Sequence, residues 1–134
     1  MKSYEVNIVK EDIFGAVYNI TANAAQQRGD DAHVATEDNK GILEEYLEKG
    51  KTVVAAALGR YGSGIEYPVI DGVKQPSVLK YSMPANWGFK DEVDERVNKF
   101  LADYIVASWM GLSAEAQLPT LELMTILNKR NKPI

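Results

Sequence analysis

His33 is the first residue to consider for chemistry, because it is the only histidine of the chain. Acid–base catalysis and zinc binding usually need a histidine with defined partners. His33 follows Asp30 and Asp31 in a polar stretch, residues 28–41, that we expect to form a loop. A solvated histidine is the expected state there, and a metal-binding or acid–base role is the alternative.

Two other segments suggest ligand binding, and each lacks a feature that the chemistry needs. The glycine-rich segment 59–64 has no Gly-Lys-Ser/Thr ending. It also leads from a predicted helix into a predicted strand, the reverse of a phosphate-binding loop. The acidic residues within 30–41 do not alternate before a glycine and a closing glutamate, as calcium ligands do. We therefore expect turn structure in the first segment and a solvated loop in the second.

Paired carboxylates in segments 43–48 and 91–95 could serve hydrolysis. Both segments fall on outward faces of predicted helices, whereas a catalytic acid needs burial to raise its pKa. The polar residues that could line a small-ligand site around a predicted hairpin are Arg60, Tyr61, Glu66 and Lys80. We predict a protein that is not an enzyme and that has no cofactor and no metal site.

Length and composition indicate one ordinary globular domain, residues 1–134, with 46% hydrophobic and 25% charged residues. The absence of cysteine excludes disulfides and thiolate metal sites and fits a reducing compartment. No apolar run is long enough for a signal peptide or a membrane span, so we expect cytoplasmic synthesis. The net charge is −4, and the basic tail 129–132 more simply complements a helix dipole than binds nucleic acid.

Hydrophobic periodicity predicts the order strand, helix, helix, hairpin, helix, helix. Alternation over 3–9 indicates a short strand. Apolar residues then recur at three- and four-residue steps. The helical stripes that we expect to be buried comprise Ile13, Val17, Ile20 and Ala24, then Ile42, Leu43, Tyr46, Leu47, Val53, Val54, Ala57 and Leu58, and then Val93, Val97, Phe100, Leu101, Tyr104, Ile105, Ser108 and Leu112. A last helix is expected over 119–131. The class is therefore α+β, mainly helical with about four helices, a β-hairpin and a short N-terminal strand.

Local signals add detail at three places. Gly50 lies on the stripe of the second helix, which predicts a close approach by a neighbouring helix or a kink. Strands are expected over 65–70 and 77–83, and Asp71 with Gly72 is a strong turn signal between them. The two prolines of this hairpin, at 68 and 76, belong on an edge or in the connection, so we expect an irregular hairpin loop.

Large aromatic residues are the best candidates for contacts with other proteins. Trp87 lies in the joint between the hairpin and the next helix, where it either covers the core end of the sheet or anchors a subunit interface. Trp109 is one step off the buried stripe of its helix. The candidate interface residues are Trp87, Tyr67, Tyr81, Trp109 and Arg60.

The order of these patterns resembles small structural proteins of Bacteroides-type phages and prophages. It is also similar in plan to the head–tail connector, or neck adaptor, proteins of tailed phages. The segments that carry the resemblance are "YEVNIVKEDIFGAVYNITANAA", "TEDNKGILEEYLEKGKTVVAAALGRY", "YSMPANW", "VNKFLADYIVASWMGL" and "NKRNKP". The resemblance implies a virion assembly protein whose helices pack into a ring and whose hairpin, 65–83, is a contact element.

The expected function is therefore structural, as a head–tail connector, neck or tail-associated protein that acts by oligomerisation. Its partners would be further copies of itself and neighbouring virion proteins. The alternative is a small bacterial interaction or regulatory domain that binds one protein partner. A small-ligand binder built from scattered polar residues is the third hypothesis.

Overall fold

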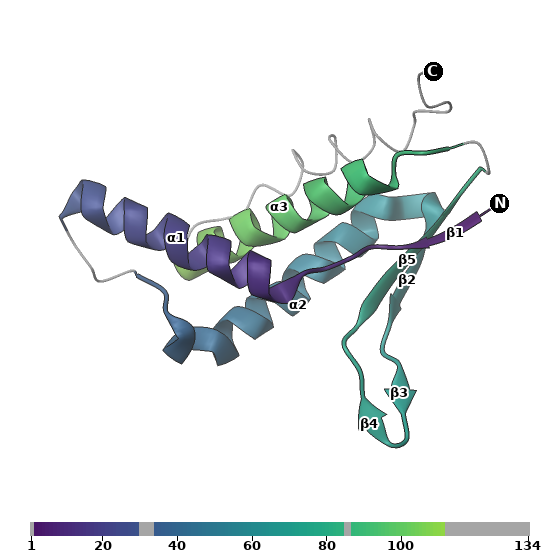
Figure 1. Ribbon diagram of the computed structural model, residues 1–134, viewed down its shortest axis with the longest axis horizontal. Helices are drawn as coiled ribbons and strands as arrows, with labels where there is room; N and C mark the ends of the chain where they lie inside the picture. The colour runs from purple at the N-terminus through teal and green to yellow at the C-terminus, as the bar shows by residue number, and fades with distance from the viewer. Residues whose placement is uncertain (1, 30–33, 85–86, 112–134) are drawn as a thin grey trace.

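The computed structural model describes residues 2–29, 34–84 and 87–111, and these form an α+β fold that is mainly helical (Figure 1). The helices are α1 (Lys10–Arg28), α2 (Lys40–Leu58) and α3 (Lys90–Trp109), with short 3₁₀ turns η1 (Glu37–Asn39) and η2 (Gly59–Tyr61). The strands are β1 (Lys2–Glu5), β2 (Gly62–Glu66), β3 (Val69–Ile70), β4 (Val73–Lys74) and β5 (Val78–Met83). The predicted class is confirmed, with three α-helices in the described part rather than about four. The helix predicted over 119–131 lies outside the described residues.

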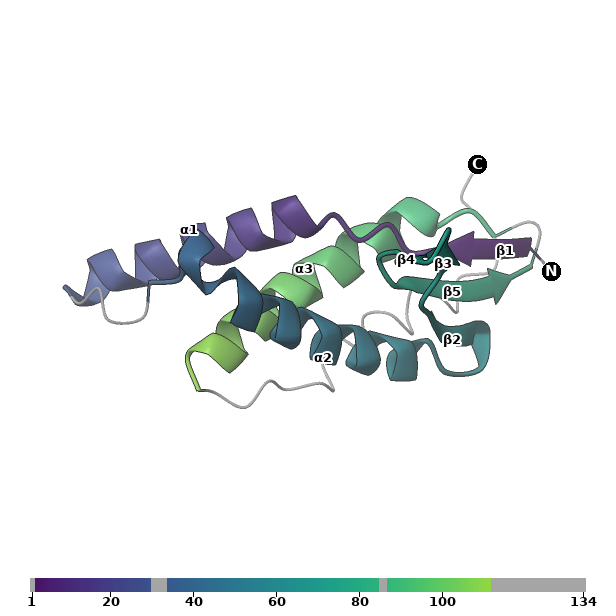
Figure 2. The same cartoon turned by 90° about the horizontal axis from the view of Figure 1, so that it is seen from below.

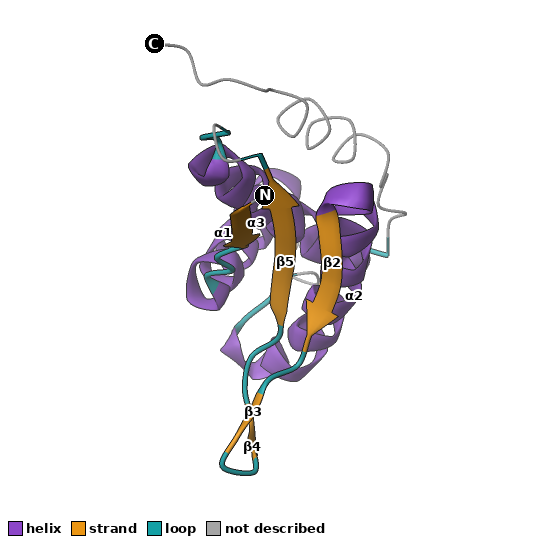
Figure 3. Cartoon of the chain, turned by 90° about the vertical axis from the view of Figure 1, so that its right-hand side faces the viewer, coloured by secondary structure: helices purple, strands orange, loops and turns teal. Residues whose placement is uncertain are grey.

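A three-stranded antiparallel sheet, in the order β1-β5-β2, packs one face against the helices (Figure 3). Side chains alternate along the central strand β5, where Leu79, Tyr81 and Met83 are buried and the residues between them are partly exposed. This alternation follows from the two-residue period of a strand. The sheet therefore has one core face and one solvent-facing face.

Helix α3 lies between α1 and α2 and contacts both (Figure 2). The predicted stripes of α2 and α3 are largely buried, and their fully buried members include Leu43, Val54, Val93, Val97, Leu101 and Ile105. Full burial of each such side chain contributes roughly 1.5–3 kcal/mol. The exception is Ile42, which is 40% exposed although its neighbour Leu43 is fully buried. Among the described residues, no helix combines the length and the apolar character needed to cross a membrane.

Gly50 lies where α2 and α3 approach each other closely. A Cβ atom at this position would lie 2.9 Å from Cδ2 of Leu101 and 3.1 Å from Cδ1 of Tyr104. Helix α2 continues through Gly50 as one element. The predicted close approach of a neighbouring helix is thus confirmed.

The buried stripe of α1 differs from the prediction after Val17. Ile20 is 39% exposed, whereas Thr21 and Ala25 are buried. The Thr21 hydroxyl donates to the Val17 carbonyl oxygen at 2.9 Å and accepts from the Ala35 N–H at 3.1 Å. Burial of this polar residue is tolerated because its hydroxyl is fully hydrogen-bonded. A pattern of apolar residues alone does not indicate that Thr21 is buried.

Strand β1 ends earlier than predicted, because side chains of α3 replace the strand ladder after Val6. The Asn7 N–H donates to Asp94 Oδ1 at 3.2 Å, and the Val9 N–H donates to Asn98 Oδ1 at 3.0 Å. Asn98 Nδ2 donates in turn to the Asn7 carbonyl oxygen at 2.6 Å. These hydrogen bonds join the segment between β1 and α1 to the start of α3.

The hairpin is longer and more regular at its tip than predicted. Strand β2 begins at Gly62 rather than Ile65, with a register shift between Gly62 and Gly64. At the far end, Ile70 pairs with Val73 across a two-residue turn in which Asp71 and Gly72 have φ of 50° and 76°. The expected irregular loop is therefore wrong, since both residues tolerate positive φ and close a tight turn. The irregular part of the hairpin lies between its two paired segments, at Pro68, which separates β2 from β3, and at Pro76, which separates β4 from β5.

Candidate functional site

The candidate interface residues do not form one surface. Trp87 and Tyr81 are buried inside the domain, Trp109 is partly buried, and Tyr67 is 52% exposed. Arg60 belongs to η2, and its side chain lies outside the described part of the structure. Only Tyr67 among these residues is placed on an open surface.

Trp87 and Tyr81 belong to an aromatic cluster at the end of the sheet, together with Tyr4 and Phe89. The Tyr4 and Tyr81 rings stack with centroids 5.4 Å apart, and the Trp87 ring meets both edge-on, at 5.2 Å and 5.7 Å. Phe89, the residue directly before α3, extends the cluster, with its ring centroid 6.0 Å from that of Trp87. Such edge-on and stacked pairs add roughly 0.5–1.5 kcal/mol each to area burial. The position of Trp87 matches the first alternative, a cover for the core end of the sheet.

The hydroxyl of Tyr81 is buried and has no hydrogen-bond partner in the described part of the chain. Burial raises the pKa of Tyr81 strongly, and the negative charge of Asp94 acts in the same direction. An unpaired buried hydroxyl costs roughly 1–3 kcal/mol. Tyr81 is therefore a packed ring with an unfavourable polar group, and no charged or reactive state of it is accessible near neutral pH.

The open surface that stands out is the tip of the hairpin, which we define as Tyr67, Val69, Ile70 and Val73. Their exposed fractions are 52%, 64%, 58% and 61%, and these are the four most exposed large hydrophobic residues in the described part. The ribbon of β3 and β4 projects away from the helices (Figures 1 and 3). The helices therefore do not cover it.

Both faces of this tip carry apolar side chains. Val69 lies opposite Lys74, and Ile70 lies opposite Val73, so the two pairs point to opposite faces of the ribbon. The Lys74 ammonium group lies 5.5 Å from the centre of the Tyr67 ring. The tip is thus an apolar ribbon with one cation on one face.

The stem of the hairpin is held by polar contacts from α2. Lys51 is 5% exposed, and its ammonium group donates to the Ser77 hydroxyl at 2.7 Å and to Glu48 at 3.0 Å. The Gln75 N–H donates to the Pro68 carbonyl oxygen at 2.8 Å across the stem. These bonds fix the direction in which the tip is presented.

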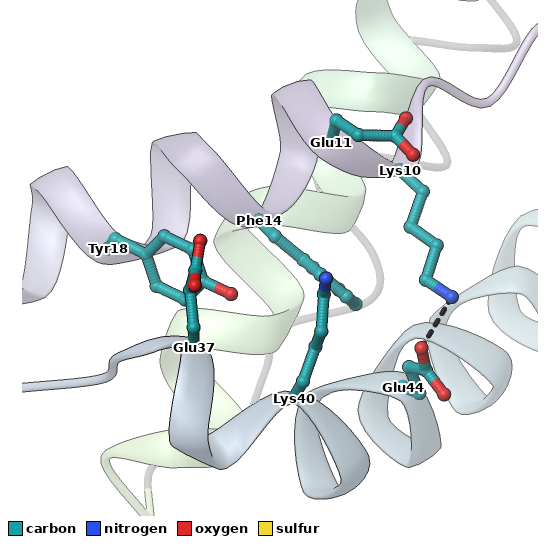
Figure 4. A pocket seen from close by; sticks show the side chains of 7 residues that line it. All are labelled: Lys10, Glu11, Phe14, Tyr18, Glu37, Lys40 and Glu44. Atoms are coloured by element: carbon teal, nitrogen blue, oxygen red, sulfur yellow. Dashed lines mark ion pairs between the residues drawn. The ribbon is translucent and has the colours of Figure 1, made fainter.

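A hollow of about 220 Å³ lies between α1 and the segment of η1 and α2 (Figure 4). Glu44 and Lys10 form an ion pair across it, and this contact lowers the pKa of Glu44. The Tyr18 hydroxyl has no hydrogen-bond partner among the residues that the structure describes, and its pKa is raised by burial and by the charge of Glu37. A lowered carboxyl pKa is the opposite of what a general acid needs, so this geometry favours no proton-transfer role.

Two of the four polar residues suggested for a small-ligand site, Glu66 and Lys80, belong to a surface ion-pair network. Lys80 lies on the solvent face of the sheet, 3.0 Å from Glu66 and 3.8 Å from Glu5. The hydrogen bond to Glu66 raises the pKa of Lys80. Tyr61 is half-buried in η2. Exposed pairs of this kind contribute little to stability.

Besides the helix predicted over 119–131, three further predictions fall outside the described residues, namely the burial of Leu112, the solvated state of His33 and the basic tail 129–132. In the ranges 2–29, 34–84 and 87–111, no three His, Cys, Asp or Glu side chains gather where they could hold a metal ion.

Sequence reasoning identified the hairpin but not its apolar tip. The missed residues are Val69, Ile70 and Val73, which flank the Asp71–Gly72 turn. A usable signal was present, because apolar residues on both sides of a tight turn leave no polar face for solvent.

Comparison of this chain with family models, with curated proteins and with solved structures gives no match.

Proposed function

We propose that this chain is a non-enzymatic assembly protein that contacts other protein subunits through the hairpin tip. The observation that carries the proposal is the exposure of all four apolar side chains of the tip by more than half. Clustered exposed apolar surface on a small domain marks protein contact sites, because its burial is favourable by roughly 25 cal/mol per Å².

The construction of the hairpin supports this role. Pro68 and Pro76 lack N–H donors, which limits uncontrolled pairing along the stem, while the tip remains open. Lys51 holds the stem through Ser77. A contact element with a fixed direction loses less entropy on binding than a free loop.

Within this proposal, the resemblance of the sequence to phage structural proteins supports a place in a virion. The chain would be a head–tail connector, neck or tail-associated protein that forms homo-oligomers, with a ring as one form, and contacts neighbouring virion proteins. It would be made in the cytoplasm and then become part of the virion. The alternative function is a bacterial interaction or regulatory domain that uses the same tip to bind one protein.

The test is the absolute mass in solution, measured by light scattering over a wide concentration range. The wild-type chain should shift from monomer to larger species as concentration rises. The variant Val69→Ser/Ile70→Ser/Val73→Ser should shift at much higher concentration or not at all. Ile20→Ser, which changes an exposed apolar residue on α1, is the matched control and should behave like wild type.

Association of the triple variant equal to that of wild type would contradict the role of the tip. A chain that stays monomeric but forms a one-to-one complex with a single protein, lost in the triple variant, would support the alternative function over oligomerisation.

A further inference from the structure

A second surface of the chain has a groove and a charge complementary to that of the hairpin tip. A groove of about 360 Å³ lies between the N-terminal half of α2 and the stem of the hairpin. Its apolar lining is Pro76, the backbone of Gly41 and the small exposed part of Leu47, and its charged lining is Lys10, Lys51 and three glutamates of α2. This volume is at the lower end of the range for binding pockets, roughly 300–1,000 Å³, and suits aliphatic side chains.

The rim of the groove carries one uncompensated negative charge. Glu44 forms an ion pair with Lys10, and Glu48 forms one with Lys51. Glu45 is exposed and has no ion-pair partner in the described part of the chain. A cation that enters the groove would therefore meet Glu45 without displacing an existing partner.

The hairpin tip has the complementary features. Its aliphatic side chains lie beside Lys74, whose ammonium group lies over the Tyr67 ring and forms no ion pair among the described residues. Asp71, the acidic residue next to the tip, lies in the turn between β3 and β4 and not in the paired strands that carry Lys74. The tip thus offers apolar side chains and one free cation to a groove with an apolar lining and one free carboxylate.

We propose that the hairpin tip of one copy docks into this groove of a second copy. The chain cannot fill its own groove, because Pro76, in the stem of the same hairpin, lines the groove, and the ribbon of β3 and β4 projects away from the helices (Figure 1). The contact joins two different surfaces, so it leaves a free tip and a free groove at the ends of each pair. Such head-to-tail contacts form closed rings or open chains. This inference rests on the proposed assembly function and names its partner surface.

A charge exchange tests the inference directly. Lys74→Glu and Glu45→Lys should each weaken self-association roughly fivefold or more, because each places like charges together. The double variant Lys74→Glu/Glu45→Lys should restore association toward the wild-type level. Lys99→Glu on the exposed side of α3 is the control for a change of net charge and should have a smaller effect. The readout is the dissociation constant from light scattering.

Cysteine cross-linking tests the same contact by distance, since the natural chain has no cysteine. A chain with Val73→Cys and Glu45→Cys should form a ladder of disulfide-linked oligomers under mild oxidation. The variant with Val73→Cys and Lys99→Cys should form no ladder beyond tip-to-tip dimers.

The outcomes separate this inference from the proposed function. Restoration by the double variant together with the ladder supports docking into the groove. If the triple serine variant loses association but the charge exchange fails to restore it and no ladder forms, the groove is not the receptor, while the tip remains a contact element. A wild-type chain that stays monomeric at every concentration overturns the inference, and a complex with another protein then decides the proposed function.

Discussion

The two ends of the hairpin carry similar residues in opposite environments. At the base, Tyr81 and Trp87 are 0% and 3% exposed and pack against the ring of Tyr4. At the tip, Tyr67 and Ile70 are more than half exposed. The difference follows from distance along the ribbon, because the helices cover the sheet and do not reach β3 and β4 (Figure 3). Aromatic and aliphatic residues in one hairpin thus serve the core at one end and are free for contacts at the other.

The largest effect should come from removing the ring that closes the buried end. Trp87→Ala should lower the free energy of unfolding by roughly 3–5 kcal/mol, because it leaves a cavity beside three other aromatic rings. The triple serine variant of the tip should change this free energy by less than about 1.5 kcal/mol, because each exposed substitution usually changes it by no more than about 0.5 kcal/mol. Both values can be measured by urea unfolding. If both variants lowered the free energy of unfolding by similar amounts, the tip would be part of the packed core and not an open surface.

A smaller effect is expected at the contact of α2 with α3, which extends the buried region. Gly50→Ala should destabilise the fold by roughly 1–3 kcal/mol, because the added methyl group would overlap the fully buried side chain of Leu101. Gly41→Ala on the same helix meets no atom within 4 Å and should stabilise by roughly 0.5–1 kcal/mol. Chemical denaturation of both variants gives the comparison. Stabilisation by Gly50→Ala would show that the helices are further apart than described.

The smallest effect concerns the unpaired hydroxyl in the aromatic cluster. Tyr81→Phe should leave stability unchanged or raise it by about 1 kcal/mol at neutral pH, because no hydrogen bond is lost. Burial raises the pKa of Tyr81, so the folded chain keeps the phenol proton at pH values where the unfolded chain, with a pKa of about 10, has released it. The contribution of Tyr81 to the free energy of unfolding is therefore at its full value below pH 10 and falls as the pH rises above 10.

The pH dependence gives this last prediction its control. Unfolding of wild type and Tyr81→Phe should be followed between pH 8 and roughly pH 11, and the variant should lose less stability above pH 10. Identical slopes for the two proteins would mean that Tyr81 is ionised equally in the folded and unfolded states, which full burial does not permit.

Much of the helical part could be predicted because its signals are local. The stripes of α2 and α3 follow from a period of 3.6 residues, and Gly50 on such a stripe indicates a close neighbour. The turn at Asp71 and Gly72 follows from their tolerance of positive φ. The burial of Thr21 could not be predicted this way, because its partner, the Ala35 N–H, comes from a different element.

At the candidate site, too, some features follow from local sequence and others depend on contacts between distant residues. The sequence by itself indicated a hairpin, a turn signal at Asp71 and Gly72, and two prolines that interrupt the strands. That the turn is a tight two-residue one was decided by the pairing of Ile70 with Val73, against the expected irregular loop. Only the tertiary structure decided that Tyr81 is enclosed while Tyr67 is open, since both occur in strand-like sequence. It also decided that β1 pairs with β5 and that Lys51 of α2 holds the stem. These outcomes depend on how far the helices extend over the ribbon, and that reach is set by contacts between residues distant in sequence.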